Sequence, residues 1–339
     1  MRVSVVIPTR NPDPANLNRV ANALALQTLP ADQWEIVIVD NASTQPVPHS
    51  AFMGLRCEVR VVTEPASGLS RARRRGVEAS QGGLLAFVDD DVLPSPGFLE
   101  TARTTFLRLP SLGTAGGNIL PEFGGPPPRW FDEFAGLLAL REIRGGERIL
   151  THLHARAPGR ESQGGNASHA PSGPVDIPDW LPNGAALLVR REAANAWVAR
   201  VQTATAGPEI TDRVGASLAS GGDQDIVLSA LLGGWHTGWF PSLEVTHLIP
   251  TARLQAAYLA RLNQGIQRSW VHVLHRYGLN PWRPISRWTA PLRKSRAYVR
   301  SAAWKSPAHR IRWRGLCGRF DGLSDVAAFE AAARSQPRK

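Results

Sequence analysis

Three consecutive carboxylates, Asp89, Asp90 and Asp91, directly follow the apolar run at residues 84–88. A short, uninterrupted apolar run is typical of a strand that is buried on both faces of a parallel sheet. The acids would then lie at the carboxyl end of that strand, the edge at which open α/β sheets bind ligands. Two negative charges about 4 Å apart repel each other by roughly 4 kcal/mol at an effective dielectric constant near 20. We therefore expect a cation here, and a divalent ion with oxygen ligands fits best.

Two further apolar runs also end in residues that suit a ligand site. The run at 35–39 is followed by Asp40, and the run at 3–7 is followed by a turn of Pro8, Thr9 and Arg10. Because the carboxyl ends of parallel strands share one edge, we expect these residues to converge with the acidic run. An aspartate for the base or ribose beside a metal for the phosphates is typical of a nucleotide pocket. Taken singly, Asp40 also suits a turn cap and the acids also suit a surface loop.

The elements that would position these residues alternate along the first 110 residues. The patterns predict buried strands at 3–7, 35–39, 59–63 and 84–88, and helices at 15–27, 69–80 and 98–109. This alternation predicts an α/β fold with a doubly wound, mostly parallel sheet. The later pattern is looser: we expect strands at 185–189 and 239–247, helices at 223–232 and 253–277, and a mobile loop over 157–179.

The composition is that of a globular protein. The chain has 339 residues, of which 43% are hydrophobic and 20% are charged, so it can bury a substantial core. Two cysteines, Cys57 and Cys317, do not make a disulfide framework and suit a reducing compartment. The sequence shows no signal peptide and no apolar run long enough to span a bilayer. These features predict a cytoplasmic protein, with any membrane contact made peripherally from the inner face of the plasma membrane.

The positive charge is concentrated in one segment. The net charge is +11, yet residues 245–320 contain no Asp or Glu, while 15 Lys and Arg and five tryptophans occur there. Three interpretations are open for this segment: a solvated face, a nucleic-acid surface, or a surface that lies on an anionic membrane. Tryptophans interleaved with arginines favour the membrane.

Several motifs together resemble the inverting glycosyltransferases of family 2, which have a GT-A (Rossmann-like) fold. The resemblance covers roughly residues 2–250 and rests on the segments 5–11, 35–43, 68–76, 87–91, 183–186 and 221–225. It implies a nucleotide-binding half at 1–110 and an acceptor half at 111–250. A basic, Trp-containing, mainly helical C-terminal extension would follow at 251–339.

The resemblance also implies roles for single residues. Asp40 would contact the nucleotide base, with Pro8, Thr9 and Arg10 lining the same pocket. Arg73 would approach the nucleotide from its helix, and the following Arg74 stands where the family usually has Asn. Asp89, Asp90 and Asp91 match the Asp-X-Asp element that positions the donor. Asp91 would hold Mn²⁺ or Mg²⁺, and His247 would join it if it is not simply a structural histidine; an imidazole and carboxylate set suits Mn²⁺ better.

A second pair of acids matches the general base of the family. Family members often read Glu-Asp here; in this chain Gly222 replaces the glutamate and Asp223 aligns with the base. Asp223 also starts an apolar-periodic helix, so it suits an N-cap as well. Asp225, two residues later, is the alternative base.

The resulting hypothesis is a metal-dependent, inverting glycosyltransferase. It would move a sugar from a nucleotide-sugar, most commonly a UDP-sugar, to a glycan or lipid-linked glycan in cell-surface polysaccharide synthesis. The alternatives are a nucleotidyltransferase and a non-catalytic nucleic-acid-binding protein. A nucleotidyltransferase typically has a Gly-rich, basic loop after the opening strand, and residues 8–14 of this chain do not provide one. The second fits poorly with a charge of −4 over residues 1–244, so we expect no nucleic-acid partner.

Overall fold

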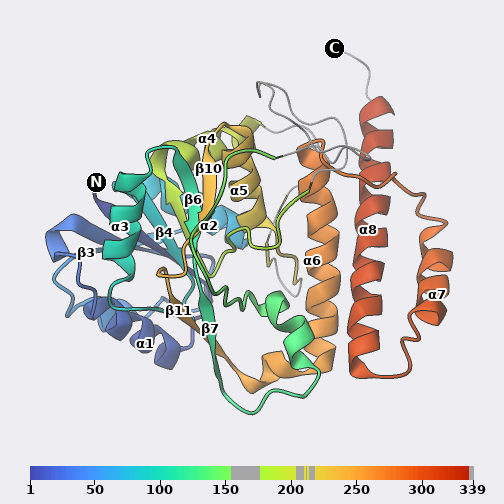
Figure 1. Ribbon diagram of the computed structural model, residues 1–339, viewed down its shortest axis with the longest axis horizontal. Coiled ribbons are helices and arrows are strands. Elements are labelled where there is room, and N and C mark those ends of the chain that lie inside the picture. The colour runs from blue at the N-terminus through green and yellow to red at the C-terminus, as the bar shows by residue number, and fades with distance from the viewer. Residues whose placement is uncertain (154–175, 204–209, 211, 214–217, 336–339) are drawn as a thin grey trace.

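A twisted, mostly parallel sheet forms the centre of the molecule, and three C-terminal helices stand beside it (Figure 1). The computed structural model describes residues 1–153, 176–203, 210, 212–213 and 218–335. Within these residues the main sheet has eight strands in the order β3-β2-β1-β4-β9-β6-β10-β8. Its strands are β1 (Val3–Thr9), β2 (Trp34–Asp40), β3 (Glu58–Thr63), β4 (Leu84–Val88), β6 (Leu112–Gly116), β8 (Arg148–Leu150), β9 (Ala186–Arg190) and β10 (His236–Trp239). Strand β9 runs antiparallel to β4 and β6, and β8 runs antiparallel to β10.

Helices cover both faces of this sheet, which explains why its central strands read as continuous apolar runs. Alternate residues of β1 point to opposite sides: Val5 packs with α1 and α3, whereas Val6 packs with α2, α4 and α5. The helices are α1 (Pro14–Ala25), α2 (Leu69–Ala79), α3 (Phe98–Arg108), α4 (Arg191–Thr203) and α5 (Gly222–Leu232). The amino terminus of α1 is capped by Asp13, which accepts a hydrogen bond of 2.8 Å from Ala15 N, with Pro14 in the first turn.

A small second sheet crosses below the carboxyl ends of the main strands. It contains β5 (Val92–Pro94), β11 (Val245–Ile249) and β7 (Ile119–Phe123), in the order β5-β11-β7. In the antiparallel pairing of β5 with β11, His247 is opposite Val92, and Leu248 N donates to Asp91 O at 2.9 Å. This pairing places His247 beside the acidic run, although 156 positions separate His247 from Asp91.

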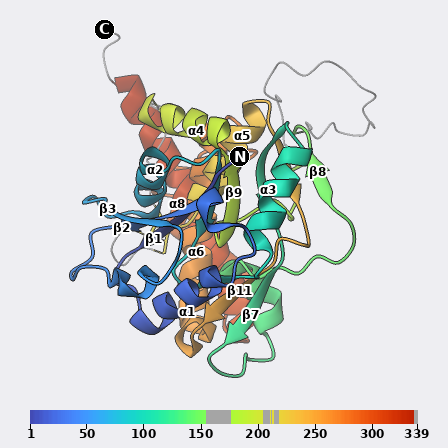
Figure 2. The ribbon, with the colours of Figure 1, turned by 90° about the vertical axis from the view of Figure 1, so that its left-hand side faces the viewer.

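The C-terminal part is helical, with α6 (Ala256–Arg276), α7 (Ala290–Arg300) and α8 (Pro307–Ser335). In Figure 2, which looks from the β3 side, α6 and α8 lie behind the sheet. Leu259 and Leu262 of α6 and Ile311 of α8 belong to the main core. Helix α7 packs on α8, at the edge of the molecule farthest from the sheet (Figure 1). Short 3₁₀ segments complete the described elements: η1 (Ala31–Gln33), η2 (His49–Phe52), η3 (Phe131–Leu138) and η4 (Thr251–Leu254).

The α/β class, the mostly parallel sheet and the helical C-terminal region confirm the sequence prediction, with two corrections. The single strand predicted at 239–247 is wrong, because the chain turns after Trp239 and its two ends pair in different sheets as β10 and β11. The strand β3 is not fully buried as predicted; it is an edge strand of the main sheet, and Val61 is exposed. Most of the loop predicted at 157–179 lies outside the described residues. No helix in the described part of the chain is long and apolar enough to cross a bilayer.

Candidate active site

A cleft of about 270 Å³ opens at the carboxyl ends of β1 and β4. Its walls contain most of the residues that the sequence singled out: Pro8, Thr9, Arg10, Arg73, Asp89, Asp90, Asp91, Asp223 and His247. Asn41, Gly184, Arg213 and Arg253 complete the polar part of the wall. The fold thus brings together strand ends, a helix and a strand of the second sheet, as the parallel topology predicts. We call this cavity the donor cleft.

Asp89 and Arg73 face each other in the donor cleft, where the side chain of Arg73 is buried and that of Asp89 is 28% exposed. Arg73 Nη2 lies 3.8 Å from Asp89 Oδ1, and its Nη1 lies 3.5 Å from Asp212 Oδ2. Arg73 is only 2% exposed because α2 packs this side chain under the strand ends. Burial raises the pKa of Asp89, while the charge of Arg73 opposes that change. Asp89 Oδ1 is itself buried and accepts no hydrogen bond from the described residues, so its charge is balanced at longer range by Arg73.

Asp90 and Asp91 have opposite electrostatic environments. Burial and the charge of Asp91 raise the pKa of Asp90 to about 7, although Thr9 Oγ1 donates a short hydrogen bond to its Oδ2. Burial also disfavours the charged form of Asp91, but the interaction with His247 and the charge of Arg253 outweigh it and lower the pKa of Asp91 to about 2. Arg253 Nη1 lies 2.9 Å from Asp91 Oδ2. Asp91 is therefore the carboxylate in this run that stays ionised most readily.

His247 has the geometry of a metal ligand. Its Nδ1 lies 3.0 Å from Leu138 O, and because a carbonyl oxygen only accepts, Nδ1 carries a hydrogen. The other ring nitrogen, Nε2, lies 3.5 Å from Asp91 Oδ1, and Arg253 Nη1 donates towards it at 3.4 Å. A backbone carbonyl that orients an imidazole in this way is typical of metal-binding histidines. In this structure the cation that contacts both the imidazole nitrogen and the carboxylate is the guanidinium of Arg253.

The residues therefore fit a divalent ion, with an incomplete protein ligand set. Within the described residues, no three His, Cys, Asp or Glu side chains gather in the manner of a complete cation site. Asp91 and His247 supply a pair, and a bound diphosphate is the natural source of further oxygen ligands. A mixed nitrogen and oxygen set suits Mn²⁺.

Asp40 and its neighbour Asn41 have different surroundings. Asp40 ends β2, and its Oδ1 accepts a hydrogen bond of 3.0 Å from Ser43 N, so it caps the turn. It is not among the residues that line the donor cleft, whereas Asn41 is. Asn41 is buried and holds the start of α2, because its Oδ1 accepts from Gly68 N at 2.7 Å. At the cleft mouth, Arg10 Nη1 donates to Ser67 Oγ at 3.0 Å.

The two candidate bases on α5 point in different directions. Asp223 lines the donor cleft, and its Oδ2 accepts a hydrogen bond of 2.7 Å from Gly184 N. Asp225 is 2% exposed and points into the core, where Trp197 Nε1 donates to it at 2.7 Å and Tyr277 Oη at 3.0 Å. Arg276 Nη1 lies 3.3 Å from Asp225 Oδ1. Asp223 is not the N-cap of α5, the role that the sequence also allowed, because α5 starts at Gly222 with Gly221 as its cap.

Asp212 is a site residue that the sequence analysis missed. It is 1% exposed, and its Oδ2 accepts a hydrogen bond of 2.9 Å from Gly222 N and faces Arg73. Burial raises the pKa of Asp212 to about 6, opposed by the charge of Arg73. A Cβ atom at Gly222 would lie 2.6 Å from Asp212 Oδ2. The sequence contained one indication of Asp212. Because this chain has Gly222 where the family often has a glutamate, a carboxylate from another part of the chain could be expected at this point.

A second cleft, of about 640 Å³, adjoins the donor cleft at Asp223. Both cavities share Asp223, Ser220, Leu137 and Ala139 in their walls. The far wall of the second cleft is aromatic and comes from the C-terminal helices, with Trp270 of α6 and Trp282 of the α6–α7 connection. Arg141, Asn183, Gln224 and Gln267 add polar groups. We call this cavity the acceptor-side cleft.

Comparison with known proteins relates part of this chain to a family. Residues 4–156 match the model of the family described as Glycosyl transferase family 2, so the chain carries a domain of that family. Its main sheet and flanking helices form the GT-A fold. The solved structure of the mannosyltransferase PcManGT from Pyrobaculum calidifontis in complex with GDP-Man and Mn²⁺ superposes with a TM-score of 0.50 at 16% identity, covering 100% of this chain and 76% of that one.

Two relatives from Haloferax volcanii are similar in sequence. Glycosyltransferase AglE is 32% identical over 142 residues, which is 40% of this chain and 45% of AglE. Glucosyl-dolichyl phosphate glucuronosyltransferase is 26% identical over 151 residues, 44% of this chain and 48% of that protein. The chain therefore spans less than half the length of the curated relatives it matches.

Proposed function

We propose that this protein is an inverting glycosyltransferase. It moves a sugar from a nucleoside diphosphate donor to a hydroxyl of a glycan or lipid-linked glycan, in cell-surface polysaccharide synthesis. The observation that carries the proposal is the position of Asp223, whose carboxylate lies on the wall shared by a metal-competent cleft and an aromatic cleft. The name of one relative, which acts on a glucosyl-dolichyl phosphate, supports a lipid-linked acceptor.

The donor cleft would bind the nucleotide diphosphate. Asp91 Oδ1 and His247 Nε2 would hold Mn²⁺ or Mg²⁺, an ion that supplies Lewis-acid stabilisation of the departing diphosphate. Arg213 and Arg253 add positive charge beside the same wall. Asp89 and Asp90 would position the donor sugar, and Pro8, Thr9, Arg10 and Asn41 would surround the nucleoside. Asp40 would contact the base through Oδ2, because Ser43 N already bonds to Oδ1. A UDP-sugar is the donor we favour.

Asp223 would act as the general base. The acceptor hydroxyl gives its proton to a carboxylate oxygen of Asp223 while its own oxygen forms the new bond to the anomeric carbon. The bond between that carbon and the diphosphate oxygen breaks on the opposite face, so the anomeric configuration inverts. Hydrogen bonds from Gly184 N and Gln224 N fix the carboxylate in place. Asp223 is favoured over Asp225 as the base because it lines the cleft. Asp225 lies in the core, where Trp197, Tyr277 and Arg276 already donate to its carboxylate.

The division of the chain follows from these roles. Residues 1–110 would bind the nucleotide, residues 111–250 would form the acceptor half, and residues 251–339 would form the basic extension. The extension contributes to the acceptor-side cleft through Trp270 and Trp282. We also propose that the protein works in the cytoplasm as a peripheral protein of the inner membrane face. The support for this is the charge of residues 245–320, which contain 15 basic and no acidic side chains.

Calorimetric titration with UDP, GDP and dTDP, each with Mn²⁺ and with chelator, tests the donor site. We expect one nucleotide to bind only with the metal and to lose binding in D91A. An assay of sugar transfer then identifies the donor by its nucleotide, and the anomeric configuration of the product is read by NMR. Absence of binding by every nucleotide would contradict the proposal, and a retained configuration would contradict its inverting mechanism.

A further inference from the structure

The outer face of α7 and the turn before it expose apolar side chains to solvent. Trp288 is 78% exposed, Leu292 is 74% exposed and Val299 is 64% exposed. Leu292 and Val299 are seven residues apart and therefore lie on one side of α7, whereas Trp288 lies in the turn that precedes the helix. At the carboxyl end of α7, Trp304 is 58% exposed and its ring lies 5.7 Å from that of Tyr298. Half of the ten large hydrophobic residues that are exposed in the described structure fall between residues 288 and 304.

Positive charges surround this apolar face. Arg293, Arg296 and Arg300 project from α7 and are exposed, and no carboxylate of the described residues pairs with them. Arg287 stacks over Trp288 at 4.7 Å, and Lys305 follows Trp304. Some other basic side chains of residues 245–320 form ion pairs, as Arg268 does with Asp325, Arg312 with Glu133 and Lys294 with Asp321. The three arginines of α7 thus add positive charge beside the exposed apolar side chains.

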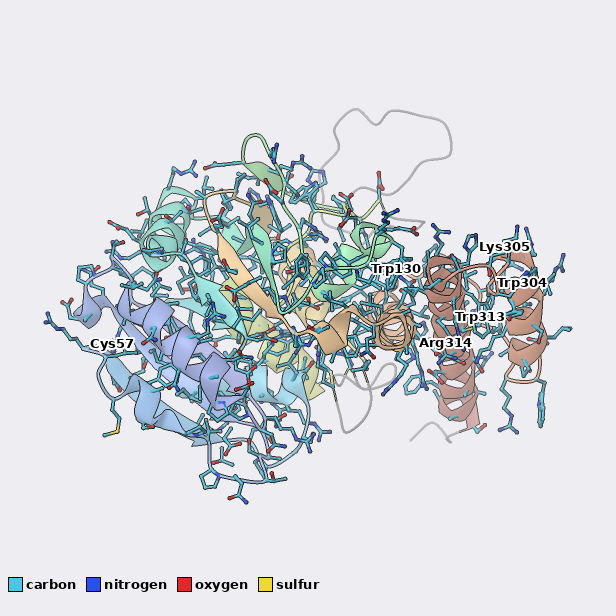
Figure 3. The ribbon with its side chains drawn as sticks, turned by 90° about the horizontal axis from the view of Figure 1, so that it is seen from below. Cys57, Trp130, Trp304, Lys305, Trp313 and Arg314 are labelled. Carbon is cyan, nitrogen blue, oxygen red and sulfur yellow. The ribbon has the colours of Figure 1, made fainter. Side chains whose placement is uncertain are left out.

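A groove with an apolar floor continues from the end of α7. Its volume is about 800 Å³, and Tyr298, Trp304 and Trp313 line it together with small residues of α6. Basic side chains stand at its rim: Arg261, Lys305, Arg310 and Arg314. Figure 3 shows Trp304, Lys305, Trp313 and Arg314 together at the end of the molecule opposite Cys57. An apolar surface with cationic borders matches a lipid, whose chain is apolar and whose headgroup is anionic.

We propose that α7 and the turn that carries Trp304 form a docking surface for an anionic lipid bilayer. We define this surface as Trp288, Leu292, Val299 and Trp304 with Arg293, Arg296, Arg300 and Lys305. The apolar residues enter the headgroup region, and the cationic residues contact lipid phosphates. This refines the peripheral location proposed above from a segment of 76 residues to one helix and one turn.

Charge and side-chain type favour a bilayer over other occupants. A second copy of the same surface would bring its arginines against identical arginines, with no acidic residue in 245–320 to compensate. A nucleic acid would leave Leu292 and Val299 in water, because aliphatic side chains neither stack on bases as aromatic ones do nor bond to phosphates. A lipid surface satisfies both kinds of side chain.

The surface is also close in sequence to the acceptor-side cleft. Pro281 and Trp282 line that cleft, and Trp288 begins the docking surface six positions later. Docking would therefore hold the cleft near the bilayer from which a lipid-linked acceptor must be taken. This last point rests on the proposed function, whereas bilayer binding itself does not.

Co-sedimentation of the full chain with vesicles tests the proposal. Vesicles of phosphatidylcholine alone are compared with vesicles that contain about 30 mol% phosphatidylglycerol, at increasing salt. We expect binding to the anionic vesicles only, reduced on the order of a hundredfold both in R293Q/R296Q/R300Q and in W288S/L292S/V299S. The control L26S/L107S removes two leucines that are 66% and 52% exposed elsewhere, and should bind as the wild type does.

The outcomes separate the alternatives. Failure of the wild type to bind anionic vesicles, or full binding by W288S/L292S/V299S, would overturn the proposal. A wild-type dimer that W288S/L292S/V299S converts to a monomer, with no vesicle binding, would assign the face to self-association instead. Thermal unfolding of each variant shows whether it is folded. Nucleotide binding by calorimetry is measured on the same samples, so failure of the donor-site proposal is seen independently of failure at α7.

Discussion

The side chains of Ser70 and Asp212 together occupy the space into which a side chain at position 222 would project. A Cβ atom at Gly222 would lie 2.6 Å from Asp212 Oδ2 and closer still to Ser70 Oγ, and Asp212 Oδ2 also lies 3.5 Å from Arg73 Nη1. Glycosyltransferases of family 2 often have Glu-Asp where this chain has Gly222 and Asp223. Asp212 therefore provides a carboxylate at the same point from a different part of the chain, and it steadies Arg73 beside Asp89.

This relationship predicts the behaviour of a reciprocal pair of variants. G222E alone should destabilise the protein by about 1 to 3 kcal/mol, because a new side chain is forced against Asp212. D212A should lower the rate of transfer on the order of ten- to a hundredfold, because Arg73 loses its support. The double variant D212A/G222E should recover part of the stability lost in G222E, since Ser70 Oγ still stands against the new side chain, and should recover activity relative to D212A. Thermal unfolding and steady-state kinetics check both, and effects that simply add would argue against the replacement.

Asp223 and Asp225 should respond differently to substitution. D223N should lower transfer by a factor of about 10² to 10⁴ while binding of the nucleotide and metal is unchanged, because only proton abstraction is lost. The measurement is single-turnover transfer beside calorimetry of the nucleotide. An active D223N protein would remove Asp223 from the mechanism.

Asp225 should instead contribute to stability. Its carboxylate joins α5 to α4 through Trp197 and to α6 through Arg276, both of them largely buried. D225A should cost about 3 to 5 kcal/mol of unfolding free energy, because it removes a buried carboxylate together with its contacts to Trp197, Tyr277 and Arg276. Chemical denaturation of D225A and D223N side by side checks this contrast, which equal stabilities would contradict.

Substitution of His247 should weaken the binding of the metal more than the binding of the nucleotide. H247A removes the Nε2 atom that faces Asp91 and should weaken Mn²⁺ binding in the presence of nucleotide by at least about tenfold. H247Q offers an oxygen or nitrogen in its place and serves as the matched variant. Titration of Mn²⁺ into the nucleotide complex gives the affinities. Unchanged affinity in H247A would make His247 a structural residue that only packs against Leu138.

Glu35 should make stability depend on pH at the acidic end. Burial opposes its ionisation, but hydrogen bonds from Ser4 Oγ at 2.6 Å and Gln81 N at 2.6 Å, with the charge of Arg60, lower the pKa of Glu35 below its usual value. Because the folded pKa is the lower one, the ionised group stabilises the fold above the unfolded value near 4.5, and this stabilisation is lost as the pH falls through the folded value.

E35Q tests this dependence. At pH 7 the variant should be less stable by about 1 to 3 kcal/mol, and the difference from wild type should shrink as the pH is lowered below about 4. Denaturation curves at several pH values measure it. E122Q is a suitable control, because Glu122 pairs with Arg19 at the surface, where an ion pair contributes about 0 to 1 kcal/mol.

The local pattern of the chain is sufficient for most of the fold of residues 1–110. Continuous apolar runs such as residues 84–88 are typical of strands covered on both faces, and the direction of parallel strands then places Thr9 and the acids Asp89 to Asp91 at one edge. These inferences need only the periodicity of side chains and the topology of alternating strands and helices. For this reason the first four strands, the helices α1, α2 and α3 and the acidic wall of the donor cleft were predictable, whereas the short strands β5, β6, β7 and β8 were not predicted.

The remaining features depend on pairings between distant segments, about which local periodicity carries no information. The pairing of β5 with β11 brings His247 to Asp91, and the packing of residue 212 against α2 brings Asp212 to Arg73. The orientation of α5 about its own axis places Asp223 in the wall of the cleft and Asp225 in the core, although both residues belong to the first turn of this helix. At α7, the bare sequence of basic residues and tryptophans could not distinguish paired arginines from free ones, because their acidic partners lie elsewhere in the chain.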